Sequence, residues 1–177
     1  MNKIIKYALI TFFCTVLSAM YYAWQQDWIV VSIPPELVNN KHNKSGKKQV
    51  SLFYFKEKWT RETTELLWSE RETQNAHQLI QATLSLLSEA GMAKKVTVER
   101  VLSGHTDQYL LIFFDQSPLP KNTSIYTKLM IIESILKTLR ENNITTPSVY
   151  FLANNHPIPD AHLDFSVTWP INGFAKV

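Results

Sequence analysis

The sequence predicts an α+β domain, built as a mainly antiparallel sheet with two amphipathic helices on one face and preceded by an N-terminal transmembrane anchor. Two segments with apolar residues at helical spacing, and strand-like runs around them, predict the domain. Residues 7–24, which contain no charged side chain, predict the anchor. We therefore divide the chain into an anchor or signal segment at residues 1–28, a linker at 29–48 and a domain at 49–177.

The composition limits both the size of the fold and its partners. A chain of 177 residues with 45% hydrophobic and 19% charged residues can bury one sizeable core. The formal net charge of +3 divides into +1 for residues 1–34, +3 for residues 35–48 and −1 for residues 49–177. Nucleic-acid binding needs lysine and arginine clustered on a folded face, so the domain is not predicted to bind nucleic acid.

The N-terminal segment is predicted to span a membrane once. Lys3 and Lys6 precede residues 7–24, which at about 1.5 Å per helical residue approach the thickness of a hydrocarbon core of roughly 30 Å. Positive residues stay on the cytoplasmic side. We expect a protein of the bacterial cell membrane with an extracytoplasmic C-terminal domain.

The same segment fits two other export signals less well. A cleavable signal peptide needs small residues one and three positions before the cut, but Leu17 precedes Ala19 and Tyr21 precedes Ala23 at that spacing. A lipoprotein signal needs a cysteine at the end of the apolar run, whereas Cys14 lies in its middle. Cys14 is also the only cysteine in the sequence, so we expect neither a disulfide nor a cysteine metal site in the domain.

The linker contains Pro34 and Pro35, followed by a polar stretch with four lysines at positions 41–48. This composition indicates a flexible, solvated tether. The alternative is that the lysines attract anionic lipid or wall polymer.

Within the domain, local patterns predict the individual elements. Strands are expected at residues 50–55, 96–103, 108–115 and 148–154, with a brief edge strand at 163–167. The second and third of these flank the turn at 104–107 and form a predicted hairpin. One helix is expected at 75–90, stopped by Gly91, and another after Thr123 or Ser124, ending near Asn142. The apolar face of the second helix is predicted to comprise Ile125, Leu129, Ile132, Leu136 and Leu139. The predicted core contains Leu52, Tyr54, Leu79, Ile80, Leu87, Leu111, Phe113, Ile132, Leu136, Val149 and Phe151.

The segment ELLWSERET, residues 65–73, has two interpretations. As a helix start, it places Glu72 three residues after Ser69, which is the capping-box spacing. As a strand, it alternates Leu66, Trp68 and Glu70 with the residues between them. The pattern alone does not decide between these two structures.

The order of these segments resembles a known domain family. VSLFYF, then LLWSERE, then a helix closing on LSEAG resembles the GerMN domain of the spore germination protein GerM. Three further segments are similar to later parts of that family: VLSGHTDQYLLIFFDQS, the helix and strand in IYTKLMIIESILKTLRENNITTPSVYFL with its pair Thr138 and Leu139, and HLDFSVTWP. The resemblance covers roughly residues 50–170. It implies that ELLWSERET is a strand, paired with the first strand through a loop around Trp59.

The resemblance also implies a function. It predicts a membrane-anchored, extracytoplasmic and non-enzymatic module that binds partners or helps to assemble a complex in the cell envelope, with a link to sporulation or germination. Expected partners are the membrane, through the N-terminal helix, and an envelope protein or cell-wall polymer. No catalytic residue, cofactor or metal is predicted.

Two alternative functions remain open. An enzyme subunit would use the cluster His156, His162 and Asp164 with the nearby Asp160, although prolines interrupt this group. It could instead use Glu70 with Arg71, although neighbouring residues on a strand face opposite sides. On a strand, only Glu70 and Glu72 would share a face. A glycan-binding module would need an exposed aromatic platform, for which the candidates are Trp59, Trp68 and Trp169.

Overall fold

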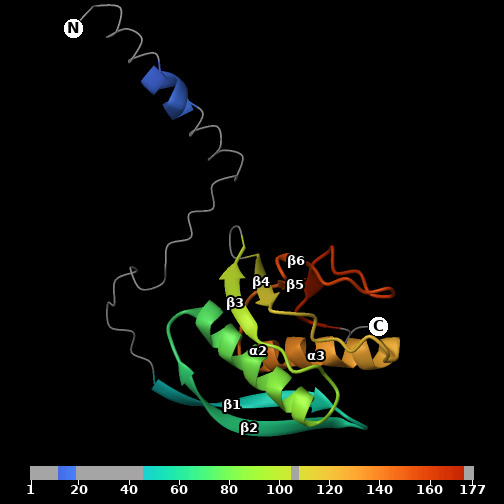
Figure 1. The fold of residues 1–177 in the computed structure, drawn as a ribbon. Helices are drawn as coiled ribbons and strands as arrows, with labels where there is room; N and C mark the ends of the chain where they lie inside the picture. Colours follow the sequence, from blue (N-terminus) through green and yellow to red (C-terminus); the bar gives the residue numbers. More distant parts are fainter. Residues whose placement is uncertain (1–11, 19–45, 105–107, 174–177) are drawn as a thin grey trace, which may run out of the picture. The chain divides into compact units, whose positions relative to one another are not determined.

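A computed structural model describes residues 12–18, 46–104 and 108–173 (Figure 1). The chain divides into two units, Met1–His42 and Asn43–Val177, and the elements below belong to the second unit. In the first unit, residues 12–18 are helical. No helix among the described residues is long and apolar enough to cross a membrane. Most of the predicted anchor and linker, and residues 105–107 of the predicted hairpin turn, lie outside the described residues.

The second unit is an α+β domain, as predicted, but it contains two sheets where one was expected. A hairpin of β1 (Gly46–Phe55) and β2 (Trp59–Trp68) forms the first sheet. Helices α2 (Glu72–Glu89) and α3 (Ile125–Glu141) lie between this hairpin and the second sheet (Figure 1). The helices therefore do not share one face of a single sheet, because apolar residues from both sheets meet in one core around them.

The second sheet is mixed. β3 (Val98–Ser103) and β4 (Tyr109–Phe114) are antiparallel, which confirms the predicted hairpin. β4 and β5 (Ser148–Ala153) are parallel, and α3 makes the crossover between them. Antiparallel pairing is thus the rule in both sheets, with this one parallel exception.

The core is largely as predicted, except on β4. Leu110, Ile112 and Phe114 pair with Val149, Phe151 and Ala153 of β5, and all six belong to the core cluster. Leu111 and Phe113 therefore point to the other face of the sheet. Leu111 is half-buried, and Phe113 is buried beneath the Arg100 guanidinium, which lies 4.2 Å from the ring centroid. Tyr54 is also only half-buried, whereas the other predicted core residues are buried: Leu52, Leu79, Ile80, Leu87, Ile132, Leu136, Val149 and Phe151.

Local signals set the helix ends. Gly91 has φ of 72°, and Met92 donates its backbone N–H to the carbonyl of Leu87, so the predicted glycine stop is confirmed. At α3, the Ser124 hydroxyl accepts from the Thr127 backbone N–H at 3.1 Å, which confirms the predicted cap. Ile125, however, is 44% exposed and does not belong to the buried face.

The segment ELLWSERET contains both a strand and a helix start. β2 includes residues 65–68, so the predicted strand is confirmed only for the first four residues of the segment. Trp59 is already the first residue of β2, so the turn lies at 56–58. α2 begins at Glu72 behind the N-cap Arg71, with no side-chain cap, so the capping box is absent. Instead, the Asn75 amide accepts from the Ser69 N–H and donates to the Ser69 carbonyl, which fixes the strand-to-helix corner.

The closing segment differs from the prediction. No strand forms at 163–167; the pairing residues are β6 (His156–Pro157) and β7 (Trp169–Pro170), both antiparallel to β5. Asn154 and Asn155 turn the chain into β6 with φ of 51° and 63°, a conformation that asparagine tolerates better than most residues.

Candidate functional site

An aromatic groove lies where the hairpin turn meets α3. Phe55 is its central ring: its centroid is 5.4 Å from that of Trp59 and 5.9 Å from that of Tyr126, both edge-to-face. Trp59 is 38% exposed and Tyr126 is 57% exposed. The groove has a volume of about 310 Å³ and is lined by Phe55, Trp59, Tyr126, Met130, Glu133, Lys137 and Arg140.

Local sequence brings these rings together. The short turn at residues 56–58 returns the chain so that Phe55 and Trp59 are directly paired across the hairpin. The Ser124 cap starts α3 just before Tyr126, which places that ring in the first helical turn. Two chain segments that are about 70 residues apart thus form one aromatic surface.

Charged side chains border the groove. The Lys137 ammonium lies 5.1 Å from the Phe53 centroid and 5.4 Å from the Trp59 centroid, within cation–π range. Arg140 donates to the Glu133 carboxylate at 2.5 Å and to the Ile171 carbonyl at 3.1 Å. Aromatic rings with a few fixed polar groups are the usual composition of a small-molecule or glycan site.

The other two tryptophans are not part of such a surface. Trp68 is half-buried, with the Lys48 ammonium 3.8 Å above its ring. Trp169 is half-buried and stacks on Phe165, with centroids 5.2 Å apart. Of the three tryptophans that the sequence suggested for a platform, the structure exposes Trp59.

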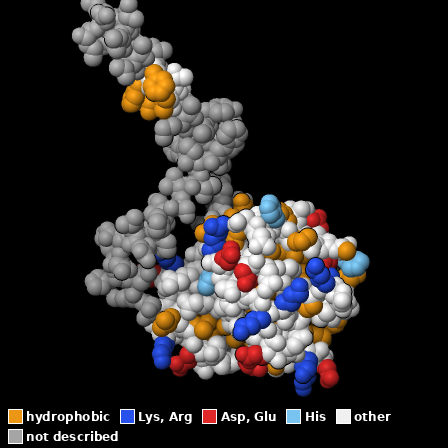
Figure 2. All heavy atoms as spheres, viewed as in Figure 1, with side chains coloured by type: hydrophobic (Ala, Val, Ile, Leu, Met, Phe, Trp, Pro, Cys, Tyr) orange, Lys and Arg blue, Asp and Glu red, His pale blue; other side chains and the backbone are white. Residues whose placement is uncertain are grey.

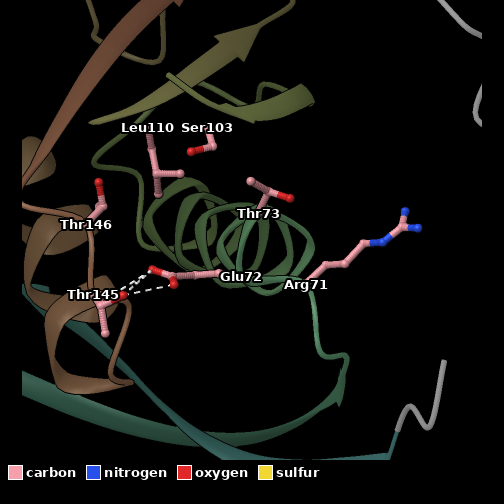
Figure 3. A pocket seen from close by; sticks show the side chains of 7 residues that line it. All are labelled: Arg71, Glu72, Thr73, Ser103, Leu110, Thr145 and Thr146. Carbon is pink, nitrogen blue, oxygen red and sulfur yellow. Dashed lines mark hydrogen bonds between the residues drawn. The ribbon is translucent and has the colours of Figure 1, made fainter. Parts of the chain in front are cut away.

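A second cavity, of about 360 Å³, lies at the start of α2 (Figure 3). The Glu72 carboxylate accepts from the Thr145 backbone N–H at 2.6 Å and from its hydroxyl at 3.0 and 3.2 Å. Arg71 also lines the cavity, but its guanidinium points away from Glu72 and Thr145. None of the residues 70–72 is on a strand, because β2 ends at Trp68 and α2 begins at Glu72. Glu72 therefore does not share a strand face with Glu70; its carboxylate binds Thr145 in the loop after α3.

Three of the four C-terminal histidines and aspartates lie together around one hollow. Asp160, His162 and Asp164 border one shallow hollow, and His156 is not in its lining. The Asp160 carboxylate binds Lys128 Nζ at 2.5 Å and accepts from the backbone N–H groups of His162 and Leu163. In the described part of the chain, no group of three or more histidine, cysteine, aspartate or glutamate residues is placed to hold a metal ion.

Both aspartates have lowered pKa values. Burial raises the pKa of Asp160, but the hydrogen bonds and charge of Lys128 and the two backbone N–H groups outweigh this effect, so the pKa lies below its ordinary 3.8. Hydrogen bonds from the Ser166 hydroxyl and N–H lower the pKa of Asp164. Carboxylates held ionised by local donors are suited to structural roles and poorly suited to proton transfer near neutral pH.

On the face drawn in Figure 2, lysine and arginine side chains are interspersed with aspartate and glutamate, and apolar side chains occur in small groups. That face presents no field of a single sign that would select a polyanion.

Sequence reasoning identified Trp59 only as one of three candidates and missed Tyr126, Lys137 and the ion pair of Lys128 with Asp160. The spacing of aromatic residues around the KEK turn is the signal that marks the hairpin part of the groove. Nothing in the sequence links that turn to α3.

Comparisons with known proteins add little. No protein-family model matches the chain, and no curated protein matches it. A solved structure with some likeness is that of a candidate lipoprotein from Clostridium perfringens, with 17% identity and a TM-score of 0.48; the alignment covers 75% of this chain and 93% of that one. This identity is too low to transfer a function.

Proposed function

We propose that this chain is a membrane-tethered, extracytoplasmic and non-enzymatic binding module of the bacterial cell envelope, and that its aromatic groove binds cell-wall glycan. The apolar run behind Lys3 and Lys6 supports the tether and its orientation. The resemblance to GerMN domains supports a place in the envelope and a link to sporulation or germination.

The observation that carries the proposal is the exposure of Trp59 and Tyr126 around Phe55, beside ordered charged groups. Large aromatic side chains that remain exposed together on a domain mark an interaction surface. A sugar ring presents a flat face of C–H groups and an edge of hydroxyls. The rings of the groove fit the first, and the Lys137 ammonium at the border of the groove fits the second.

An enzymatic function is not proposed. Asp160 and Asp164 are engaged by local donors, and Glu72 is engaged by Thr145. An envelope protein as the groove's partner is the alternative outcome of the experiment below.

The test is binding of purified cell-wall glycan strands by the full-length protein. Trp59→Ala removes the exposed ring next to Phe55 and should weaken binding at least about tenfold, since truncating an aromatic anchor removes roughly 2 kcal/mol. The matched control is Leu102→Ala, which removes another exposed apolar side chain, 45% exposed on β3. Circular dichroism should show that both variants keep the fold.

Two results would contradict the glycan proposal. The first is wild-type protein that does not bind the strands. The second is a Trp59→Ala variant that binds as tightly as the Leu102→Ala control. If glycan is not bound while crosslinking through the groove captures an envelope protein in a Trp59-dependent way, the groove is a protein-docking site.

A further inference from the structure

The two edges of the β1–β2 hairpin differ in how they are covered. On β1, the Ser51 N–H donates to Asn142 Oδ1 at 3.1 Å, and the Ser51 carbonyl accepts from Asn142 Nδ2 at 2.7 Å. The Phe53 N–H donates to Thr138 Oγ1 at 3.0 Å. Side chains of α3 and its C-cap thus occupy the edge of β1, which blocks further strand pairing there.

The same contacts determine which groups of β2 point outward. Ser51 and Phe53 turn their backbone groups away from β2, and their partners in the register are Thr63 and Arg61. In an antiparallel ladder, residues directly opposite each other both turn their groups inward or both outward, and this alternates along the strand. The backbone groups of Arg61, Thr63 and Glu65 therefore point away from β1.

No described residue covers that outer edge. β2 pairs with β1 alone in a two-stranded sheet, and Figure 1 shows it as the outer strand of the hairpin. The side chains of Arg61, Thr63 and Glu65 are exposed. A strand of ten residues with free outward N–H and C=O groups is a template for another strand.

We propose that the occupant of this edge is β2 of a second copy of the chain, paired antiparallel about a two-fold axis at Thr63. In this register Arg61 lies opposite Glu65 of the second copy, and symmetry repeats the pair. Trp59 lies opposite Leu67 of the second copy, again twice. The two hairpins then form one four-stranded sheet with an isologous interface.

Charge complementarity selects this register. Opposite charges directly across a ladder stabilise it, and like charges destabilise it. Centring the axis on Arg61 or Glu65 places that residue against itself, and centring it on Glu62 or Thr64 forms no pair between Arg61 and Glu65. Thr63 is the centre among these that matches both charges.

The apolar ends of the strand agree with this register. Leu67 is 56% exposed and Trp59 is 38% exposed, and the pairing brings each against the other. The present partners of the charged residues are weakly held: Lys47 lies 3.8 Å from Glu65 with both side chains largely exposed, and Arg61 donates to the Ser51 hydroxyl in a solvent-exposed hydrogen bond. Both charges are therefore available to a second copy.

The first test is crosslinking of the full-length protein with Cys14 replaced by serine. In a hydrogen-bonded antiparallel pair the two Cα atoms lie about 5.5 Å apart, so Thr63→Cys should form an intermolecular disulfide. Thr60→Cys is the matched control on the same strand. In the proposed register its two copies are offset by six residues, roughly 20 Å, so it should not crosslink.

The second test measures the dimer dissociation constant by analytical ultracentrifugation. Arg61→Glu places like charges opposite each other twice and should raise the constant about tenfold or more. Combining Arg61→Glu with Glu65→Arg restores both pairs and should restore the wild-type constant. Three results would each overturn the proposal: equal crosslinking of the two cysteine variants, a failure of the combined exchange to restore dimerisation, or a wild-type protein that stays monomeric up to millimolar concentration.

Discussion

Lys128 and Asp160 form a buried ion pair whose removal should have a large effect on stability. Lys128 lies in the first turns of α3, and Asp160 lies in the closing segment, 32 residues further along the chain. Their side chains are 5% and 7% exposed, and Nζ lies 2.5 Å from the carboxylate. The pair thus anchors the irregular C-terminal segment to a helix of the core.

The effect of Lys128→Met can be worked out from this geometry. Breaking a buried pair by removing one partner costs about 3–5 kcal/mol, because the remaining charge is buried without compensation. Asp160 keeps the N–H groups of His162 and Leu163, so we expect the lower end, about 3 kcal/mol. For a domain of this size, that corresponds to a melting temperature lower by roughly 10 °C.

Urea and thermal unfolding, followed by circular dichroism, measure this loss. Lys137→Met is the control on the same helix, because its pair with Glu141 and its cation–π contacts with Phe53 and Trp59 are partly exposed and should together contribute about 1 kcal/mol or less. Lys128→Met combined with Asp160→Asn removes both charges and keeps an acceptor for the two N–H groups. The double variant should be more stable than Lys128→Met alone; equal losses for Lys128→Met and Lys137→Met, or a double variant less stable than either single variant, would refute the reasoning.

Three further predictions follow from single contacts. The lowered pKa of Asp160 contributes stability that is present above its ordinary value of 3.8 and is lost as the pH falls through the folded value, so unfolding measured from pH 6 to pH 2 should be less pH-dependent in Asp160→Asn. Asn142→Ala leaves Ser51 without its edge partner and should lower the free energy of unfolding by about 1–3 kcal/mol, whereas the exposed Asn122→Ala should change it little; equal effects would contradict the edge role. Gly173→Ala places a Cβ against the Glu133 carboxylate at a φ of 63° and should lower the melting temperature, and an unchanged melting curve would show that this turn adapts freely.

The elements that could be predicted from sequence have local causes. Gly91 ends α2 through its own backbone freedom, and Ser124 starts α3 through its own hydroxyl. The hairpin of β3 and β4 follows from two apolar runs around a short turn. Each of these signals acts over a few residues, which is the range that a sequence pattern can read.

The inner face of β4 depends on longer-range packing. β4 is apolar along its whole length, YLLIFF, so alternation does not mark its inner face. The parallel pairing with β5 selects Leu110, Ile112 and Phe114, and this pairing is made across the α3 crossover. The sequence could therefore indicate that β4 is buried but not which side of it faces the helices.

The candidate site was predictable only in part for the same reason. Three tryptophans in the domain were equal candidates in the sequence, and their exposure depends on what lies above each ring: Lys48 over Trp68, Phe165 against Trp169, and open groove beside Trp59. Asn142 gave no functional signal in the sequence, since a polar residue at the end of a helix is ordinary. Its role in covering the edge of β1 depends on a contact with Ser51, which is distant in the sequence.

The hairpin carries both proposed interactions, through different groups of β2. The groove uses the side chain of Trp59, whereas dimer pairing uses the backbone from Trp59 to Leu67 and the charges of Arg61 and Glu65. Reversing one charge, as in Arg61→Glu, should therefore weaken association without removing the aromatic rings. Because Trp59 also lies opposite Leu67 of the second copy, the two equilibria share one side chain. Thermodynamic linkage then requires that dimerisation change glycan affinity by the same factor by which glycan changes the dimerisation constant.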